Sequence, residues 1–289
     1  MMANNPQLMV FSKNLLGPSL GEIARRLRAM GVSSLDLTVR AGGHVEPSRA
    51  REELPRAQAE LHAQGVEIGQ ITTNLTDAHH DDARAVLETA ARCGIGFYKL
   101  GYFAYQGFGT LRKARDEARD RVRDLAQLSA EIGICGGFHN HSHNFIGASV
   151  PDIDFVLSDQ SAIGVYFDPA HASIEGGISG WEIGLDLLQE RIVMLAVKDY
   201  AWVENGQGAG GRRFKVQWVP LQNGNVPWPR VVEHLQTIGF DGPISLHSEY
   251  RGAHSFRDLC GEELWQQTAR DTEVFRGWVE AARRRGENN

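Results

Sequence analysis

The segment ICGGFHNHSHN, residues 134–144, contains in a few residues the pattern from which the fold can be read. An uncharged, largely apolar run at 134–139 comes directly after Gly133, and polar side chains follow it at once. Before the glycine, residues 111–132 have the apolar spacing of an amphipathic helix. Glycine adopts the left-handed conformation that ends a helix at little cost, so the order is helix, turn, strand and polar loop.

The same unit recurs along the chain at a spacing of about 30 residues. Short strand-like runs occupy residues 8–11, 34–39, 67–71, 96–101, 134–139, 163–168, 192–198 and 243–249. Helical patterns alternate with them over residues 20–30, 49–64, 81–93, 111–132, 152–157, 181–189, 228–238 and 263–284. Eight such units predict an α/β protein, a single (β/α)₈ TIM barrel over residues 1–289.

An open, doubly wound parallel sheet is the alternative architecture. Such a sheet has fewer strands and often carries a G-x-G-x-x-G phosphate loop after the first strand. Residues 13–18, KNLLGP, do not match that pattern. The closed barrel is therefore the preferred prediction.

One segment interrupts the spacing between the seventh and eighth predicted strands. Residues 202–227 are rich in glycine, asparagine and proline. In a barrel this segment is an enlarged active-site loop, and such loops can act as lids. A surface insertion without a role at the site is the alternative.

Composition restricts the partners and the location of the protein. The net charge of −6 argues against nucleic acid, whose binding depends on neutralising phosphates. No apolar run approaches the length of about 20 residues that spans a bilayer, and residues 1–7 lack the features of a signal peptide. The three cysteines form no CxxC pair, which favours reduced thiols and a cytoplasmic location.

Histidines gather where the predicted strands end. Six of the eleven lie at or just after such an end: His44, His139, His141, His143, His171 and His247. Barrel enzymes carry their chemistry at the C-terminal ends of the strands. We therefore expect the active site at this face of the barrel.

Strand alternation lets polar pairs point toward the barrel axis, because residues i and i+2 share a face. Such pairs are His139 with His141, Tyr166 with Asp168, Ala196 with Lys198, and His247 with Glu249. A charge in that position is costly unless it is paired or bound to a metal. The alternative to an active site is a buried salt bridge that serves packing alone, such as Lys198 with Asp168.

Five stretches carry a resemblance to a known family. They read LDLTVR at 35–40 with GHV at 43–45, FHNHS at 138–142, FDPAH at 167–171, VKDYAW at 197–202 and GPISLHSEY at 242–250. In this order they resemble the sugar phosphate isomerase/epimerase family of xylose-isomerase-like barrels. The resemblance implies a sugar or sugar-phosphate isomerase or epimerase that uses a divalent metal.

The resemblance also implies a ligand set, with two departures in this chain. Family members hold the metal with a Glu, an Asp, a His and a Glu on strands five to eight. Asp168 and Glu249 match two of these positions, whereas His139 stands for the first Glu and Ala196 for the His. The expected ligands are therefore His139, Asp168 and Glu249, for Mn, Zn, Fe or Co. A further ligand could come from His141, His171 or His247.

The expected chemistry is proton abstraction next to a carbonyl, through an enediolate. Glu249 is the predicted base, with a pKa raised by partial burial. Lys198 would stabilise the oxyanion, and His139 or His141 would return the proton as a group that titrates near neutral pH. The side chains expected to bind substrate hydroxyls or a phosphate are Arg40, His44, Lys99, His141, His171 and His247.

Other functions stay open at this point. A lyase or dehydratase acting on a keto-sugar or keto-glycoside would share the first step. A barrel that binds a sugar without catalysis is a further possibility, supported by the changes at His139 and Ala196. A metal-dependent endonuclease is disfavoured by the acidic net charge. The expected partner is a small carbohydrate, and the chain could also form a homo-oligomer.

Overall fold

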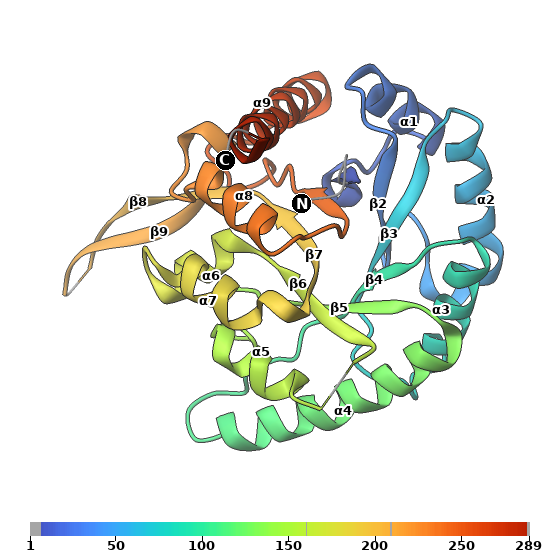
Figure 1. Ribbon diagram of the computed structural model, residues 1–289, viewed down its shortest axis with the longest axis horizontal. Coiled ribbons are helices and arrows are strands. Elements are labelled where there is room, and N and C mark those ends of the chain that lie inside the picture. Colours follow the sequence, from blue (N-terminus) through green and yellow to red (C-terminus); the bar gives the residue numbers. More distant parts are fainter. Residues whose placement is uncertain (1–6, 160, 209, 288–289) are drawn as a thin grey trace.

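Eight parallel strands form a closed barrel in the computed structural model, which describes residues 7–159, 161–208 and 210–287 (Figure 1). Around the barrel the strand order is β1-β10-β7-β6-β5-β4-β3-β2. The bounds are β1 Leu8–Phe11, β2 Ser34–Val39, β3 Glu67–Thr73, β4 Phe97–Lys99, β5 Cys135–His139, β6 Ile163–Phe167, β7 Ile192–Val197 and β10 Ile244–Leu246. The predicted (β/α)₈ barrel is confirmed, and the open sheet is excluded.

Helices surround the barrel and cover the outer face of the sheet (Figure 1). They are α1 Leu20–Ala29, α2 Ala50–His62, α3 Ala83–Arg92, α4 Leu111–Ile132, α5 Val150–Leu157, α6 Pro169–Gly176, α7 Gly180–Leu188, α8 Trp228–Thr237 and α9 Gly261–Glu287. The pattern predicted over residues 111–132 matches α4, whose C-cap is Gly133 with φ 79°. Within residues 7–159, 161–208 and 210–287, no helix is long and apolar enough to cross a membrane.

Helix α6 was not predicted, and its cause lies in the residues that begin it. Asp168 is the N-cap, and its side chain accepts a hydrogen bond from the backbone N–H of His171. Pro169 occupies the first turn, where its missing N–H costs nothing. The sequence of this helix, PAHASIEG, contains few large apolar residues and shows no clear helical period, so only its capping residues could have revealed it.

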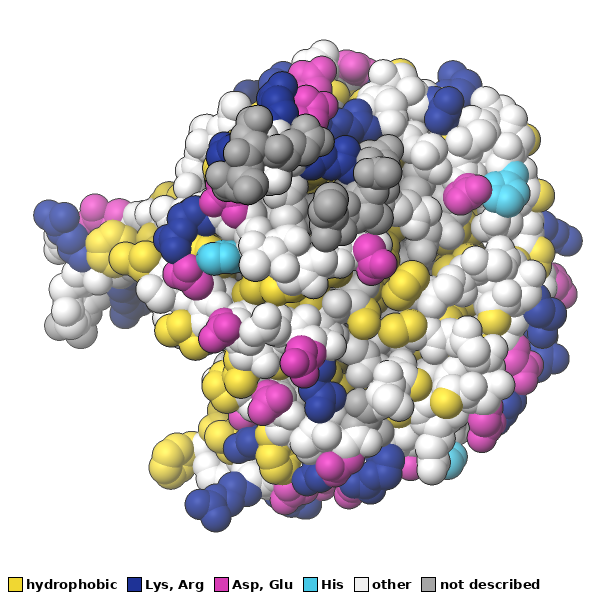
Figure 2. Space-filling model, in the orientation of Figure 1, with side chains coloured by type: hydrophobic (Ala, Val, Ile, Leu, Met, Phe, Trp, Pro, Cys, Tyr) yellow, Lys and Arg dark blue, Asp and Glu magenta, His cyan; other side chains and the backbone are white. Residues whose placement is uncertain are grey.

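The segment between β7 and β10, predicted as an enlarged loop, contains a β-hairpin. Strands β8 (Asp199–Gly208) and β9 (Gly211–Val219) pair in antiparallel fashion. The hairpin projects from the barrel and carries basic and hydrophobic side chains side by side (Figures 1 and 2). Trp202 and Phe214 are about half exposed on it. Glycine at four of its positions, 206, 208, 210 and 211, hid the strand pattern in the sequence.

The interior of the barrel depends on glycines in β5 and β6. A Cβ atom on Gly137 would lie 2.4 Å from Sδ of Met194, and one on Gly164 would lie 2.5 Å from Val193. The bare backbone leaves room for Tyr166, Met194 and Ala196, which form a small separate cluster of buried residues. The close approach of Met194 to Gly137 shows that a larger residue would not fit at this position of β5.

Candidate active site

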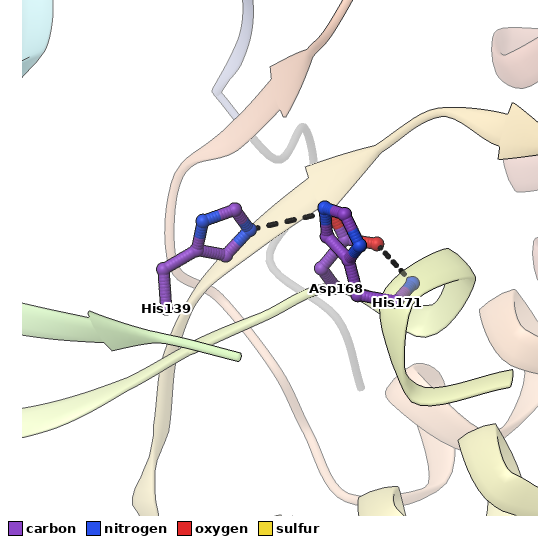
Figure 3. Close-up of side chains that lie close together, drawn as sticks. All are labelled: His139, Asp168 and His171. Atoms are coloured by element: carbon purple, nitrogen blue, oxygen red, sulfur yellow. Dashed lines mark hydrogen bonds and ion pairs between the residues drawn. The ribbon is translucent and has the colours of Figure 1, made fainter. Parts of the chain in front are cut away.

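Side chains from four barrel strands and one helix converge at the C-terminal face. His139 ends β5, and Asp168 and His171 lie where β6 passes into α6 (Figure 3). Lys198 directly follows β7, and Glu249 lies in the turn after β10. The first four of these residues are at most 5% exposed. These residues therefore lie together at the face where the sequence predicts the site.

The closest group is His139, Asp168 and His171. Nε2 of His139 lies 3.3 Å from Oδ2 of Asp168, and Nε2 of His171 lies 3.8 Å from the same oxygen. The other ring nitrogens are engaged, since Nδ1 of His139 meets the Tyr102 hydroxyl at 3.1 Å. Nδ1 of His171 meets Oγ of Ser142 at 2.8 Å. Nε2 of His171 has no hydrogen-bond partner among the described residues.

Both imidazoles are neutral at ordinary pH. Burial lowers the pKa of His139 well below its usual value, and the charges of Lys198 and Lys99 act in the same direction. Burial also lowers the pKa of His171 well below its usual value, and the charge of Lys198 is the next largest cause. The expectation that His139 titrates near neutral pH is therefore wrong.

These three residues fit a divalent metal. Two neutral imidazoles and one carboxylate offer three ligand atoms within 4.8 Å of one another, and they are the one such group in residues 7–159, 161–208 and 210–287. Each ring has its Nδ1 next to a hydroxyl, the outer contact that turns Nε2 of a histidine toward a metal. This mix of ligands suits Zn, Mn or Fe. This group contains two of the expected ligands, His139 and Asp168, and His171, which was predicted as a possible further ligand; Glu249 is not part of it.

Glu249 is bound to two lysines. Its Oε2 lies 3.2 Å from Nζ of Lys198, and its Oε1 lies 2.6 Å from Nζ of Lys13. Burial alone would raise the pKa of Glu249, but Lys198 and Lys13 outweigh it and hold the pKa well below its usual value. The expected rise in this pKa is therefore wrong, and the carboxylate is fully ionised at neutral pH.

Lys198 links the two carboxylates of the site. Its Nζ lies 3.3 Å from Oδ2 of Asp168 as well as 3.2 Å from Glu249. Burial lowers the pKa of Lys198, but Glu249 and Asp168 more than compensate, so the net shift is upward. The ammonium also lies 4.5 Å from the ring centroid of Trp218 on β9. The base of the hairpin thus touches the site directly.

Two of the other predicted binding histidines lie close to this group. The ring of His141 is 4.0 Å from that of His171, and burial, with Lys198, lowers the pKa of His141 to about 3. Nε2 of His247 lies 2.8 Å from the Tyr166 hydroxyl. Neither ring is protonated at neutral pH, since burial also lowers the pKa of His247 well below its usual value. Both are hydrogen-bonding groups rather than charges.

Three predicted binding residues lie on the side of β2 and β4. Nζ of Lys99 is 3.5 Å from the centroid of the Tyr102 ring and has no hydrogen-bond partner among the described residues. Burial, with the charge of Arg40, lowers the pKa of Lys99 well below its usual value. Nδ1 of His44 meets Oγ1 of Thr38 at 3.0 Å. The guanidinium of Arg40 lies 5.9 Å from the centroid of the Phe11 ring.

A buried network of polar side chains inside the barrel is linked by hydrogen bonds to His247 of the site, and it was not predicted from the sequence. Asp36 accepts hydrogen bonds from Gln70 and Thr72 at 2.7 Å and from Ser245 at 2.8 Å. Gln70 also lies 3.2 Å from the hydroxyl of Tyr166, which reaches His247. Burial raises the pKa of Asp36 to about 6, against the effect of its three donors. A carboxylate inside the apolar run LDL, residues 35–37, was the available signal.

Fold and site together define the class of the protein. The model of the family described as xylose isomerase-like TIM barrel matches residues 24–276. The chain belongs to this family, and the resemblance read from the sequence is confirmed. No curated protein matches the chain.

Solved structures share the barrel at low sequence identity. A xylose isomerase-like TIM barrel protein from Mycobacterium smegmatis, in complex with magnesium, is 16% identical, covers 98% of this chain and 99% of its own, and has a TM-score of 0.70. The 3-keto-D-glucoside 4-epimerase YcjR from E. coli is 12% identical, with 94% of this chain and 100% of its own covered and a TM-score of 0.67. The probable 3-DHS dehydratase AsbF from Bacillus anthracis is 15% identical, with 93% of this chain and 98% of its own covered and a TM-score of 0.68. These likenesses establish the fold.

Proposed function

We propose that the protein is a sugar isomerase or epimerase that abstracts a proton next to a carbonyl. The observation that carries this proposal is the contact between an ionised and largely buried carboxylate, Glu249, and a buried ammonium, Lys198, at 3.2 Å. A base and an electrophile held this close can act on neighbouring atoms of one substrate. The epimerases among the similar structures, which act on a 3-keto-D-glucoside and on D-psicose, support a carbohydrate substrate.

In the proposed reaction, Glu249 takes the proton from the carbon next to the carbonyl. The electron pair of the broken C–H bond moves into a new C=C bond, and the carbonyl oxygen becomes an oxyanion. Lys198 donates a hydrogen bond to this oxyanion, which stabilises the enediolate. Protonated Glu249 then delivers the proton to the former carbonyl carbon. The hydroxyl on the carbon that was deprotonated passes its proton to the oxyanion and becomes the new carbonyl, which completes an isomerisation. Epimerisation instead returns a proton to the original carbon from the opposite face.

We assign His139 to a metal together with Asp168 and His171. When bound, a divalent ion would polarise the substrate carbonyl as a Lewis acid. The two roles predicted for His139, ligand and proton donor, exclude each other because both need Nε2, while Nδ1 is engaged with Tyr102. In the absence of a metal, the tautomer with a proton on Nε2 can donate to Asp168.

Deuterium exchange tests the first step whatever the product. Keto-sugars including D-fructose, D-psicose and D-tagatose, with a 3-keto-glucoside, are incubated with the protein in D₂O, and NMR follows deuterium entering next to the carbonyl. Glu249→Gln is expected to slow exchange by about 10²–10⁴-fold, the usual contribution of a general base. The control, Glu117→Gln, changes a carboxylate that is 57% exposed.

The outcomes separate the candidate functions. Exchange with an epimer or isomer as product supports the proposal, whereas exchange with loss of water or of an aglycone indicates the lyase. Undiminished exchange in Glu249→Gln overturns the assignment of the base. Absence of exchange in the wild type, across the panel and with each metal supplied, leaves the binding function as the better account.

A further inference from the structure

A cavity lies at the same face of the barrel as the proposed catalytic group, and the proposed reaction does not use it. It is formed by the loops after β2 and β3 and by the start of α3, and its volume is about 330 Å³. This is within the range of sites for small molecules, about 300–1,000 Å³. Both loops leave the C-terminal ends of their strands, so the cavity is on the catalytic face of the barrel.

Arg40 connects this cavity to the catalytic group. It lines the cavity, and its guanidinium lies 5.9 Å from the centroid of the Phe11 ring. The Phe11 ring in turn lies 4.5 Å from that of His247. In the part of the chain that the structure describes, the guanidinium has no hydrogen bond or ion pair. Its five N–H donors are therefore available to a ligand that reaches from one site to the other.

The charges of the lining disfavour an anionic ligand. Three carboxylates, Glu46, Asp77 and Asp82, face one guanidinium, which leaves a formal charge of −2. A phosphate or carboxylate would be repelled, whereas hydroxyl groups would find acceptors. The three carboxylates do not form a metal site. Among the described residues, three ligand atoms lie within 4.8 Å of one another only at His139, Asp168 and His171.

Two of these carboxylates are already held in place. Oε1 of Glu46 accepts from the backbone N–H of Gly42 at 2.8 Å, and Oδ1 of Asp77 accepts from that of His79 at 2.8 Å. Each bond fixes one oxygen and orients the other without occupying it. Pro47 and Leu75 add apolar surface to the lining, against which the C–H face of a sugar ring can pack.

We infer that this cavity is a subsite for a second, uncharged sugar ring, so that the substrate is a glycoside or a disaccharide rather than a sugar phosphate. The inference rests on the proposed function for the identity of the reacting sugar. Arg40 lies at the junction of the two rings and donates hydrogen bonds to both. The carboxylates accept from hydroxyls of the distal ring.

Calorimetric binding measurements on one ketose in several forms test the subsite. The probes are D-fructose, D-fructose 6-phosphate, and fructose carrying a second ring at different hydroxyls, as in turanose, lactulose and isomaltulose. At least one disaccharide is expected to bind tenfold more tightly than fructose, and the phosphate no more tightly than fructose. The subsite is overturned if no disaccharide binds more tightly than fructose, or if the phosphate binds more tightly than every disaccharide.

Two variants locate the effect. Ala41 is exposed and lines the cavity, so Ala41→Trp is expected to remove the tenfold advantage while fructose binding stays unchanged. Asp82→Asn keeps the shape of the cavity but removes a charged acceptor, so it is expected to reduce the tighter binding of the disaccharide. Helix α3 should tolerate the change, because the side chain of Asp82 makes no cap hydrogen bond to it. The matched control is Ala63→Trp, exposed at the end of α2 and outside the cavity. An advantage that persists in both cavity variants overturns the inference.

These measurements need no turnover, which separates the subsite from the reaction. A disaccharide advantage that is lost in Ala41→Trp supports the subsite even in a protein that shows no deuterium exchange. Exchange on fructose without any disaccharide advantage supports the proposed function and rejects the subsite.

Discussion

Replacing Lys198 by methionine is expected to destabilise the protein through the charges that it leaves behind. The side chain of Lys198 is 3% exposed, and its partners Asp168 and Glu249 are 0% and 11% exposed. Methionine fills a similar volume without a charge. Two buried carboxylates then lose the same ammonium, although Glu249 keeps Lys13 at 2.6 Å.

The size of the effect follows from that asymmetry. Removing one partner of a buried pair costs about 3–5 kcal/mol. Because Glu249 retains a lysine, the loss falls mainly on Asp168, so the lower end, about 3 kcal/mol, is expected. A chain of 289 residues has an unfolding entropy of about 0.6 kcal/mol per degree. The midpoint of thermal unfolding should therefore fall by about 5 °C.

Thermal unfolding followed by circular dichroism, with EDTA present, measures this shift without a metal to replace the ammonium. Adding Asp168→Asn to Lys198→Met is expected to recover part of the loss, because the uncompensated charge disappears. Lys113→Met is the control, since Lys113 is 83% exposed in its pair with Glu117 and its loss should leave the midpoint unchanged. The reasoning would be refuted if the midpoint of thermal unfolding of Lys198→Met equalled that of the wild type, or if the double variant unfolded at no higher temperature than Lys198→Met.

Two further predictions concern the buried network and the metal. Asp36→Asn should flatten the pH dependence of stability. The folded carboxyl has a pKa of about 6 against 3.8 in the reference state, so the folded protein binds the extra proton between these values. The contribution of Asp36 to the free energy of unfolding should therefore fall by about 3 kcal/mol as the pH rises through that window. Urea unfolding between pH 4 and 7 measures it, and an unchanged slope in the variant would contradict it. Elemental analysis after loading with Mn or Zn should show metal lost in His139→Ala and His171→Ala but kept in Glu249→Gln. Loss with Glu249→Gln instead would favour the ligand set read from the sequence, and equal metal in all variants would reject the site.

Local patterns carried much of the fold. The barrel strands and the helices from α1 to α9, apart from α6, were found within a few residues, because each buries an apolar face that repeats with the period of its element. Strand ends were less accurate at the catalytic face. There β10 ends at Leu246, three residues before the predicted end, because polar side chains turn the chain into a loop.

The hairpin shows what composition does not contain. Residues 202–227 were read as a loop from their glycines, asparagines and proline. The paired strands β8 and β9 derive their order from each other, with Tyr200 opposite Trp218 and Trp202 opposite Val216. Cross-strand pairing is a contact between distant residues, and composition alone does not contain it.

By itself, the sequence determined the barrel, and it indicated the polar residues that gather at the C-terminal ends of the strands, because periodicity and strand-end position are local properties. Only the tertiary structure decided which charges meet. Lys13 and Glu249 are 236 positions apart in the chain, yet their ion pair, with Lys198, reverses the expected shift in the pKa of Glu249. The tertiary structure likewise places His171 next to Asp168, through a helix that the sequence did not reveal. Electrostatic energy depends on distance in space and on exclusion of water, and the closed barrel sets both.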